Sequence, residues 1–527
     1  MPETTGSPAP SPPPSQVGAA LRHFFRSIEP STYFYVFVAF VATAPAWIVR
    51  YPPIQDLPFH LATIRVIHSY SDPAYGFQND FAMTFGRTQY VLYYLVASFF
   101  AYFVGVVNAN ILLMCGYLGG TPLALRALLK ALGKDERLCI LVIPLLINVM
   151  FMFGLLPFVM GIPVMFWALA VSVRHFEKPT RKTGILLAVL ALILFHLHVF
   201  PFGIFGLGFA AMFPWSKPQK WIVAGAPTIP ALLLMARWTL FTDAGRLSAG
   251  AIRPGPLDHV APINTAIPGA FQWLTDVFHD TSDEVTMIAL VAVAFLLVGL
   301  SQGDRDKSKP AARAYALLPI ACIFFYFTLA EGHGYIWLIA QRFPILCLMT
   351  GIPLLRMPQG MRGIFATVLA LGVALGSTIN TCKHFIEFQL EEVGDIDGAI
   401  EAIPPAQHVA ALIYDRGSNV TNWAPFLHFG SYYQLKKGGV IEFTYAGYAH
   451  WPFDFKPGKY PPPGGPARGR WEWTPDQVSI RELYPYYDYV VTRGNGFKPP
   501  SDAFQATWHG DKWTVWKRVG PGGLATP

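Results

Sequence analysis

The sequence carries little charge for its length. Only 13% of its 527 residues are Asp, Glu, Lys or Arg, whereas 53% are hydrophobic, and a soluble domain averages about 25% charged residues. Several apolar runs approach the roughly 20 residues that cross the hydrocarbon core of a bilayer. The composition therefore excludes a soluble globular protein and indicates a polytopic α-helical membrane protein.

Other signatures are also missing. The apolar runs do not alternate strictly between apolar and polar residues, which disfavours an outer-membrane barrel. The five cysteines have no metal-ligand spacing, so we expect them to be small buried hydrophobes. No internal repeat is visible. The net charge of +7 comes mostly from short loops between apolar runs, where it sets membrane topology rather than indicating nucleic acid as a partner.

The chain divides into three parts. Residues 1–30 are rich in Pro and Ser and begin "MPETTGSPAPSPPPSQVG", which lacks the basic and apolar regions of a signal peptide and predicts a disordered cytosolic tail. Residues 31–382 form a transmembrane domain with two long outer loops, 51–108 and 238–283. Residues 383–527 have too many charges and prolines for further spans, and we expect an extracytoplasmic α/β domain.

Hydropathy predicts eleven membrane spans. Basic residues concentrate in alternate loops, which places the N-terminus in the cytosol and the C-terminus outside. The segment "QYVLYYLVASFFAYFVG" is interpreted as an interfacial helix, because counting it as a span would invert every later loop and spoil this charge bias. The predicted spans are 31–50, 109–127, 138–153, 155–173, 183–200, 203–215, 221–237, 284–301, 314–330, 343–356 and 363–382.

The tail contains three strand-like patterns. "HVAALIYD" and "YDYVVTRG" are short, apolar and rich in β-branched residues, and "TWHGDKWTVWKRV" resembles a closing strand or hairpin. These patterns predict a small sheet within the outer domain.

An acid and a histidine follow the first span directly. In "YPPIQDLPFHLATIRVIHSY", Asp56 lies six residues beyond the predicted outer end of that span. Pro58 suits the first turn of a short interfacial helix, on which Asp56 and His60 would share a face. Asp56 could simply cap that helix, or it could be a catalytic acid or base.

Further ionisable residues gather at the same predicted side. Ionisable groups at a membrane boundary are costly and tend to mark function. Each has a simpler interpretation: the histidines could be satisfied core residues, the acid could cap a helix, and an arginine could anchor the outer leaflet. Their shared location favours a common site. The candidates are Asp80, His196, His198, Arg253, Glu331, His333 and Arg342.

In architecture the chain resembles the GT-C glycosyltransferases, including the protein O-mannosyltransferases and the bacterial lipid-A aminoarabinose transferases. The resemblance lies in an acidic first outer loop, many further spans and an outer α/β tail. It is carried locally by "QDLPFHLATI", "LRALLKALGKDER", "GLLPFVMGIPVMFWALA" and "QRFP". Members often show paired acids in the first loop, whereas Asp56 stands between Gln55 and Leu57. No metal cofactor is indicated, and the cofactor stays unknown.

The resemblance implies an integral protein of a bacterial inner or plasma membrane that moves a sugar from a polyprenyl-phosphate donor to an extracytoplasmic glycan, lipid or protein. Transfer would be a single inverting displacement with Asp56 as general base and His60 beside it. The other ionisable residues would bind substrate. Two alternatives stay open: a non-catalytic membrane assembly or scaffold protein, and a transporter or flippase of envelope lipids.

Overall fold

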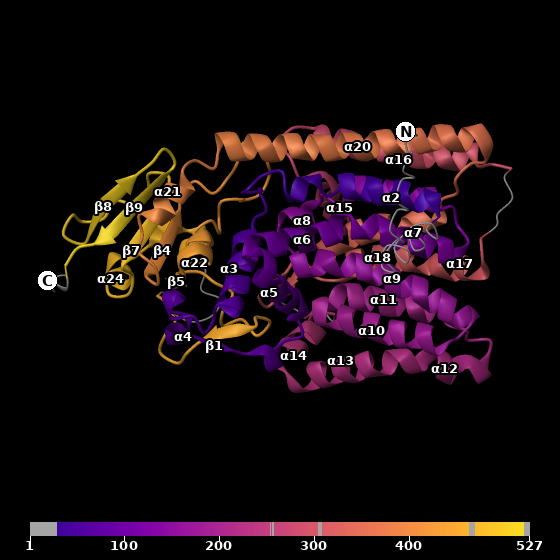
Figure 1. The fold of residues 1–527 in the computed structure, drawn as a ribbon, viewed down its shortest axis with the longest axis horizontal. Helices are drawn as coiled ribbons and strands as arrows, with labels where there is room; N and C mark the ends of the chain where they lie inside the picture. Colours follow the sequence, from indigo (N-terminus) through magenta and orange to yellow (C-terminus); the bar gives the residue numbers. More distant parts are fainter. Residues whose placement is uncertain (1–28, 253–254, 256–257, 304–307, 463–469, 521–527) are drawn as a thin grey trace, which may run out of the picture.

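The computed structural model describes residues 29–252, 255, 258–303, 308–462 and 470–520. Within these ranges a helical part and a smaller part with a sheet lie end to end (Figure 1). The tail predicted to be disordered, residues 1–30, falls almost entirely outside the described residues, as does Arg253.

The helices up to residue 391 belong mostly to a bundle in which they lie side by side, whereas the short helix of residues 77–80 lies near the sheet (Figure 1). In chain order these are α2 (Pro30–Val41), α3 (Leu57–His68), α4 (Phe77–Asp80), α5 (Leu92–Val104), α6 (Val106–Leu118), α7 (Gly120–Leu132), α8 (Val149–Met152), α9 (Leu156–Glu177), α10 (Arg181–Leu197), α11 (Val199–Met212), α12 (Trp221–Gly225), α13 (Ile229–Phe241), α14 (Asp243–Gly250), α15 (Ile263–Thr275), α16 (Ser282–Leu300), α17 (Pro310–Tyr315), α18 (Leu317–Thr328), α19 (Phe343–Gly351) and α20 (Gly360–Glu391).

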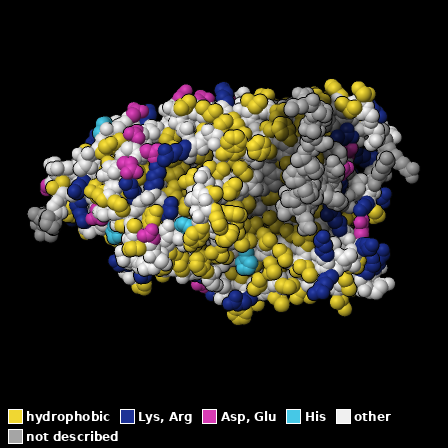
Figure 2. Space-filling model, viewed as in Figure 1, with side chains coloured by type: hydrophobic (Ala, Val, Ile, Leu, Met, Phe, Trp, Pro, Cys, Tyr) yellow, Lys and Arg dark blue, Asp and Glu magenta, His cyan; other side chains and the backbone are white. Residues whose placement is uncertain are grey.

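Six helical stretches in the described part are long and apolar enough to cross a membrane: Val106–Leu132, Leu156–Glu177, Pro218–Phe241, Ser282–Leu300, Pro310–Thr328 and Gly360–Glu391. Figure 2 shows a broad hydrophobic surface across the middle of the molecule, with charged side chains mostly toward its two ends. These features support an integral membrane protein. The total of eleven spans stays a prediction.

One predicted span, 138–153, is not a continuous α-helix. It consists of a 3₁₀ stretch, Glu136–Leu145, followed by α8. The segment still runs from one end of the bundle to the other. At one end Glu136 pairs with Arg126 at 2.7 Å, and at the opposite end the carbonyl oxygen of Phe153 accepts a hydrogen bond from the Asp56 amide. Residues 138–146 are buried, so protein rather than lipid surrounds this irregular backbone, as a membrane requires.

Two short strands, β2 (Gly332–His333) and β3 (Ile336–Trp337), lie between α18 and α19. The elements after α20 form the C-terminal part: α21 (Ile396–Glu401), α22 (Ser431–Lys437), α23 (Arg470–Trp473), α24 (Ile480–Leu483), and the strands β4 (His408–Ile413), β5 (Val440–Ile441), β6 (Phe453–Phe455), β7 (Tyr489–Arg493), β8 (Phe504–His509) and β9 (Trp513–Arg518). Five strands form one sheet in the order β5-β4-β7-β9-β8, parallel over β5-β4-β7 and antiparallel over β7-β9-β8. All three strand-like patterns of the tail thus lie in this sheet.

The first loop folds together with the C-terminal part. Strand β1 (Phe81–Met83) pairs antiparallel with β6, and α22 packs against α3. The Nε of Arg65 on α3 donates to the carbonyl oxygen of Leu435 on α22 at 3.0 Å. Helix α3, expected at the membrane interface, is instead largely buried, because the C-terminal part covers it. Helix α5 keeps an exposed aromatic face that includes Phe99, Tyr102 and Phe103, as an interfacial helix would.

Helix α20 connects the two parts. Its 32 residues correspond to about 48 Å at 1.5 Å per residue, more than the roughly 30 Å hydrocarbon core. It continues to Glu391 instead of ending at residue 382, and Figure 1 shows it running along the bundle toward the sheet. The side chain of Gln389 accepts a hydrogen bond from the Tyr51 amide at 3.0 Å, so its last turns hold the start of the first loop.

This arrangement predicts on which side of the membrane the sheet lies. We expect a topology reporter fused after Val519 to be active only on the extracytoplasmic side, because the loops at the opposite end carry most of the basic residues. Paired alkaline phosphatase and green fluorescent protein fusions at this position would measure it. Phosphatase activity without fluorescence is the expected result, and the reverse would contradict the predicted orientation.

Candidate functional site

Asp56 stands directly before α3, with a proline in the first turn as the sequence predicts. Its side chain makes no capping hydrogen bond to the helix. It turns instead toward the C-terminal part of the chain and is only 6% exposed. The helix-cap interpretation therefore does not account for this carboxylate.

Three side chains from distant parts of the sequence form a cluster with this carboxylate: two contact it directly, and the third contacts one of those two. The Nδ1 of His428 lies 3.0 Å from Asp56 Oδ1, in an ion-pair contact whose direction departs from ideal hydrogen-bond geometry. The Tyr445 hydroxyl donates to Asp56 Oδ2 at 3.0 Å. On its other side, His428 Nε2 hydrogen-bonds the carboxylate of Glu472. One imidazole thus stands between two buried carboxylates.

The cluster is lined by aromatic rings. The Phe59 ring centroid lies 3.9 Å from that of His428, and Phe443 stacks on the imidazole at 5.8 Å. Burial alone would lower the pKa of His428, but the negative charges of Glu472 and Asp56 outweigh it and raise the pKa to about 9. His428 is therefore an imidazolium at neutral pH.

His60 has no free nitrogen for chemistry. Its Nε2 donates to the carbonyl oxygen of Gly154 at 2.7 Å, and its Nδ1 accepts from the Tyr94 hydroxyl at 2.9 Å. Burial lowers the pKa of His60 to about 4, so the ring is neutral. His60 thus supports the start of α3, and its predicted catalytic role gains no support from this geometry.

Two other predicted residues, His198 and Arg342, meet at a second location. The backbone amide of Phe200 donates to His198 Nδ1 at 3.2 Å, which leaves the proton of a neutral ring on Nε2. The Nη1 of Arg342 lies 3.4 Å from that Nε2. Since both groups then carry hydrogens, the arginine gains no acceptor from this contact.

Arg342 is a buried cation with few partners. It is 5% exposed, its Nη2 donates to the carbonyl oxygen of Trp337 at 3.2 Å, and its Nε has no partner. The rings of Phe158 and Phe200 lie 5.4 and 4.6 Å from its guanidinium carbon. Among the described residues no carboxylate pairs with it, although a buried charge normally requires a counter-charge.

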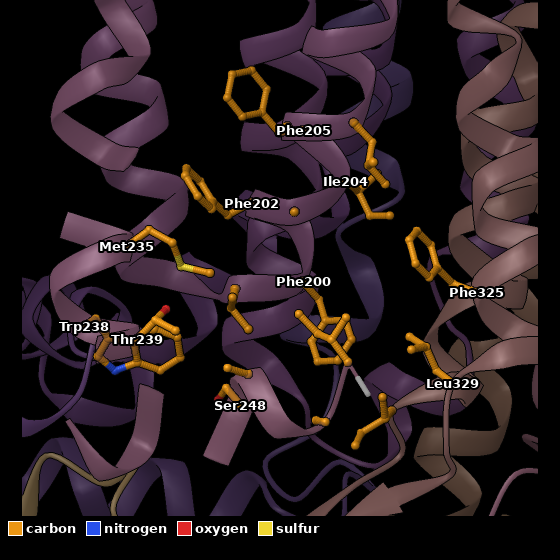
Figure 3. Close-up of a pocket in the computed structure, with 18 of the residues that line it drawn as sticks. Phe200, Phe202, Ile204, Phe205, Met235, Trp238, Thr239, Ser248, Phe325 and Leu329 are labelled. Carbon is orange, nitrogen blue, oxygen red and sulfur yellow. The ribbon is translucent and has the colours of Figure 1, made fainter. Parts of the chain in front are cut away.

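A large apolar cavity adjoins Arg342. It measures about 610 Å³ and lies between α11, α13 and α18, with α14 and the segment 336–343 closing one end. This volume falls within the roughly 300–1,000 Å³ of ligand pockets. Figure 3 shows side chains of α11, α13 and α18 around this space. Phe200 lines the cavity and also contacts the Arg342 guanidinium, so the cation lies directly behind the cavity wall.

A row of contacts connects Asp56 with this cavity, although Asp56 does not line it. From Tyr445, ring contacts lead to Tyr448 at 5.7 Å and then to Tyr335 at 4.5 Å. The Tyr335 hydroxyl hydrogen-bonds His450 Nδ1 at 2.7 Å, and His450 Nε2 hydrogen-bonds the Ser248 hydroxyl at 2.9 Å. Ser248 lines the cavity.

The other predicted site residues serve different contacts. Asp80 lies 3.6 Å from His408 and 3.7 Å from Lys459, so it attaches the first loop to the C-terminal part. His333 pairs with Asp258 at 2.8 Å, and the amide of Glu331 donates to the carbonyl oxygen of His259. His196 lies in the last turn of α10.

The residues missed by sequence reasoning are His428, Tyr445 and Glu472. A weak signal existed, because His428 lies in the apolar stretch "WAPFLHFGSYY", where a histidine needs a polar partner. In the described ranges, no group of three or more His, Cys, Asp or Glu side chains is arranged to hold a metal ion.

No protein-family model matches the chain, and comparison with curated proteins found no match.

Gly154 fixes the position of Asp56 and provides a first test. Its φ is +86°, and a Cβ there would lie 2.8 Å from Asp56 Cβ. Gly303 has a similar φ of +85° but open space around it. Alanine at either position adds roughly 1–3 kcal/mol of backbone strain, and only Gly154→Ala also displaces Asp56. We expect it to lower the unfolding temperature in detergent more than Gly303→Ala does; equal effects would contradict the close packing.

The charge on His428 predicts a pH dependence of stability. Its pKa is about 9 in the folded protein and near 6.5 in an unfolded chain. Its contribution, on the order of a few kcal/mol, is therefore complete below pH 6.5 and is lost as pH rises through 9. We expect the unfolding temperature to fall over this window, and a variant that combines His428→Gln with Asp56→Asn and Glu472→Gln to flatten that part of the curve. An unchanged slope in this combined variant would exclude the cluster as its source.

Proposed function

We propose that the protein is a membrane glycosyltransferase that uses a polyprenyl-phosphate-linked sugar as donor and acts at the extracytoplasmic side. The apolar cavity would hold part of the polyprenyl chain, Arg342 would face the phosphate, and Asp56 would act on the acceptor. The donor sugar and the acceptor would meet between these two places.

The observation that carries the proposal is the unpaired arginine beside the cavity. Buried charges are stable when an opposite charge compensates them, and Arg342 lacks a carboxylate among the described residues. Its neighbour is a cavity between apolar helices, which suits a hydrocarbon chain. A ligand with an anionic head and an apolar tail satisfies both features, and a polyprenyl phosphate has this chemistry.

The proposed reaction is one displacement at the anomeric carbon. The acceptor hydroxyl oxygen bonds to that carbon while its bond to the phosphate oxygen breaks, and the electron pair leaves with the phosphate. Arg342 would stabilise the charge that develops there. Asp56 would take the acceptor proton as general base. Both Asp56 oxygens already have contacts, but a carboxylate offers about four lone-pair positions.

The row from Tyr445 to His450 would form the sugar site. Sugars present apolar C–H faces together with hydroxyl groups, and tyrosine offers both a ring surface and a polar hydroxyl. The row begins at the proposed base and ends at Ser248 on the cavity wall, so it covers the path between the donor tail and the acceptor.

A second candidate function is a non-catalytic assembly protein. It is favoured by the burial of Asp56, which is 6% exposed and engaged by His428 and Tyr445. In this interpretation the cluster only fastens the C-terminal part onto the first loop.

Donor binding can be measured without knowing the sugar. We expect undecaprenyl phosphate to raise the unfolding temperature of the protein more than neutral undecaprenol does. Arg342→Gln should remove the preference for the phosphate, about 10- to 100-fold in affinity, since a charge-assisted hydrogen bond contributes about 1.5–3 kcal/mol. Gly203→Phe should weaken binding of both lipids, because Gly203 lines the cavity and a side chain there has open space.

Two variants serve as matched controls for these measurements. Arg246 is exposed and paired with Asp243, so Arg246→Gln should bind like the unmodified protein. Gly372 on α20 has open space around it and does not line the cavity, so Gly372→Phe should do the same. Equal binding of phosphate and alcohol by the unmodified protein would refute the donor site.

The catalytic proposal predicts a large effect of one conservative change. Asp56→Asn should lower sugar transfer in membranes supplied with a panel of polyprenyl-phosphate sugars by about 10²–10⁴-fold, the usual contribution of a general base. Binding of undecaprenyl phosphate should persist, because Arg342 and the cavity are intact. Full transfer activity in this variant would reject Asp56 as the general base, whereas absence of transfer by the unmodified protein would favour the assembly function.

A further inference from the structure

His428 lies between two carboxylates that come from different parts of the fold. Asp56 belongs to the first loop and Glu472 to α23. Both carboxylates are buried, at 6% and 8% exposure, and His428 itself is 4% exposed. Phe59 lies against one face of the imidazole, with 3.9 Å between the ring centroids, and the two ring nitrogens make the charged contacts to the carboxylates.

The charges of the cluster constrain one another. Two carboxylates buried this close together repel, and without a cation one of them takes up a proton. An imidazolium between them compensates one negative charge and contacts both. Burial raises the pKa of Glu472, although His428 opposes the shift. The proton on His428 is thus the central charge of the cluster, since the imidazole contacts a carboxylate on each side.

We infer that His428 is a positioning residue, which holds Asp56 in its carboxylate form and aims it, while Glu472 keeps the proton on the imidazole. The inference rests on the proposed role of Asp56 as general base. His428 does not touch the substrate; it acts through Asp56. When Asp56 accepts the proton of the acceptor, one imidazolium and one carboxylate remain, so proton transfer removes the excess negative charge of the cluster.

Other titratable groups face this cluster and have to be separated in any test. Glu442 follows β5, and burial raises its pKa to about 8; the charge of Glu472 adds to this rise, whereas backbone hydrogen bonds and His428 oppose it. His60 on α3 is neutral, and Tyr445 donates to Asp56. Of these, Glu442 is the carboxyl whose protonation would overlap with that of the cluster, so the measurements are best made in a Glu442→Gln background.

Infrared spectroscopy of the full-length protein in nanodiscs tests the inference directly, since a protonated carboxyl has its own C=O stretch. At pH 7, His428→Gln should gain one such band in the Glu442→Gln background. Adding both Asp56→Asn and Glu472→Gln should remove the band, because neither carboxyl of the cluster then remains. His384→Gln is the matched control: His384 is buried but pairs with Asp280, a half-exposed carboxylate, and no band should appear.

A second variant keeps the test valid if His428→Gln does not fold. Glu472→Gln removes the main partner that holds the imidazole proton, so the pH-dependent fall of the unfolding temperature should move to lower pH. An unchanged midpoint, or a folded His428→Gln variant without a new carboxyl band, would overturn the inference. Neither measurement depends on sugar transfer. A new band together with full activity in Asp56→Asn would support the charge balance but reject the proposed function.

Discussion

The contact between Asp56 and His428 joins two regions that are 372 residues apart in the sequence. Neither charge is stable alone at this depth, because an uncompensated buried charge costs several kcal/mol. The first loop and the C-terminal part are therefore coupled: α3 is covered by α22, β1 pairs with β6, and the end of α20 holds Tyr51. The C-terminal part completes the candidate site instead of forming a separate module.

Arg342 presents the opposite situation, a buried cation whose counter-charge is missing from the described residues. We propose that an anionic ligand compensates this charge and, because the adjoining cavity is apolar, that the ligand carries a hydrocarbon chain. The two charged residues have separate proposed roles: Arg342 would stabilise the leaving phosphate, and Asp56 would accept the proton. Separate variants can therefore distinguish donor binding from proton transfer.

Local patterns in the sequence predicted several features of this structure. Apolar runs located most of the helices, and the tail patterns located β4, β7 and the β8–β9 pair. Ionisable residues near span ends selected Asp56, His198 and Arg342 as candidates, whose roles stay predictions. Local patterns do not show contacts between distant residues. His428 and Glu472 come near Asp56 only when the tail folds onto the first loop. Hydropathy could not distinguish the 3₁₀ stretch Glu136–Leu145 from an α-helix, because its residues are as apolar as those of the neighbouring helices.

We propose that Arg342 and the cavity bind a polyprenyl phosphate within reach of Asp56. An electron cryo-microscopy structure of the full-length protein in nanodiscs containing undecaprenyl phosphate would test this most directly. We expect the phosphate beside Arg342 and the polyprenyl chain between α11, α13 and α18. An empty cavity, or a phosphate bound elsewhere with Arg342 still unpaired, would contradict it.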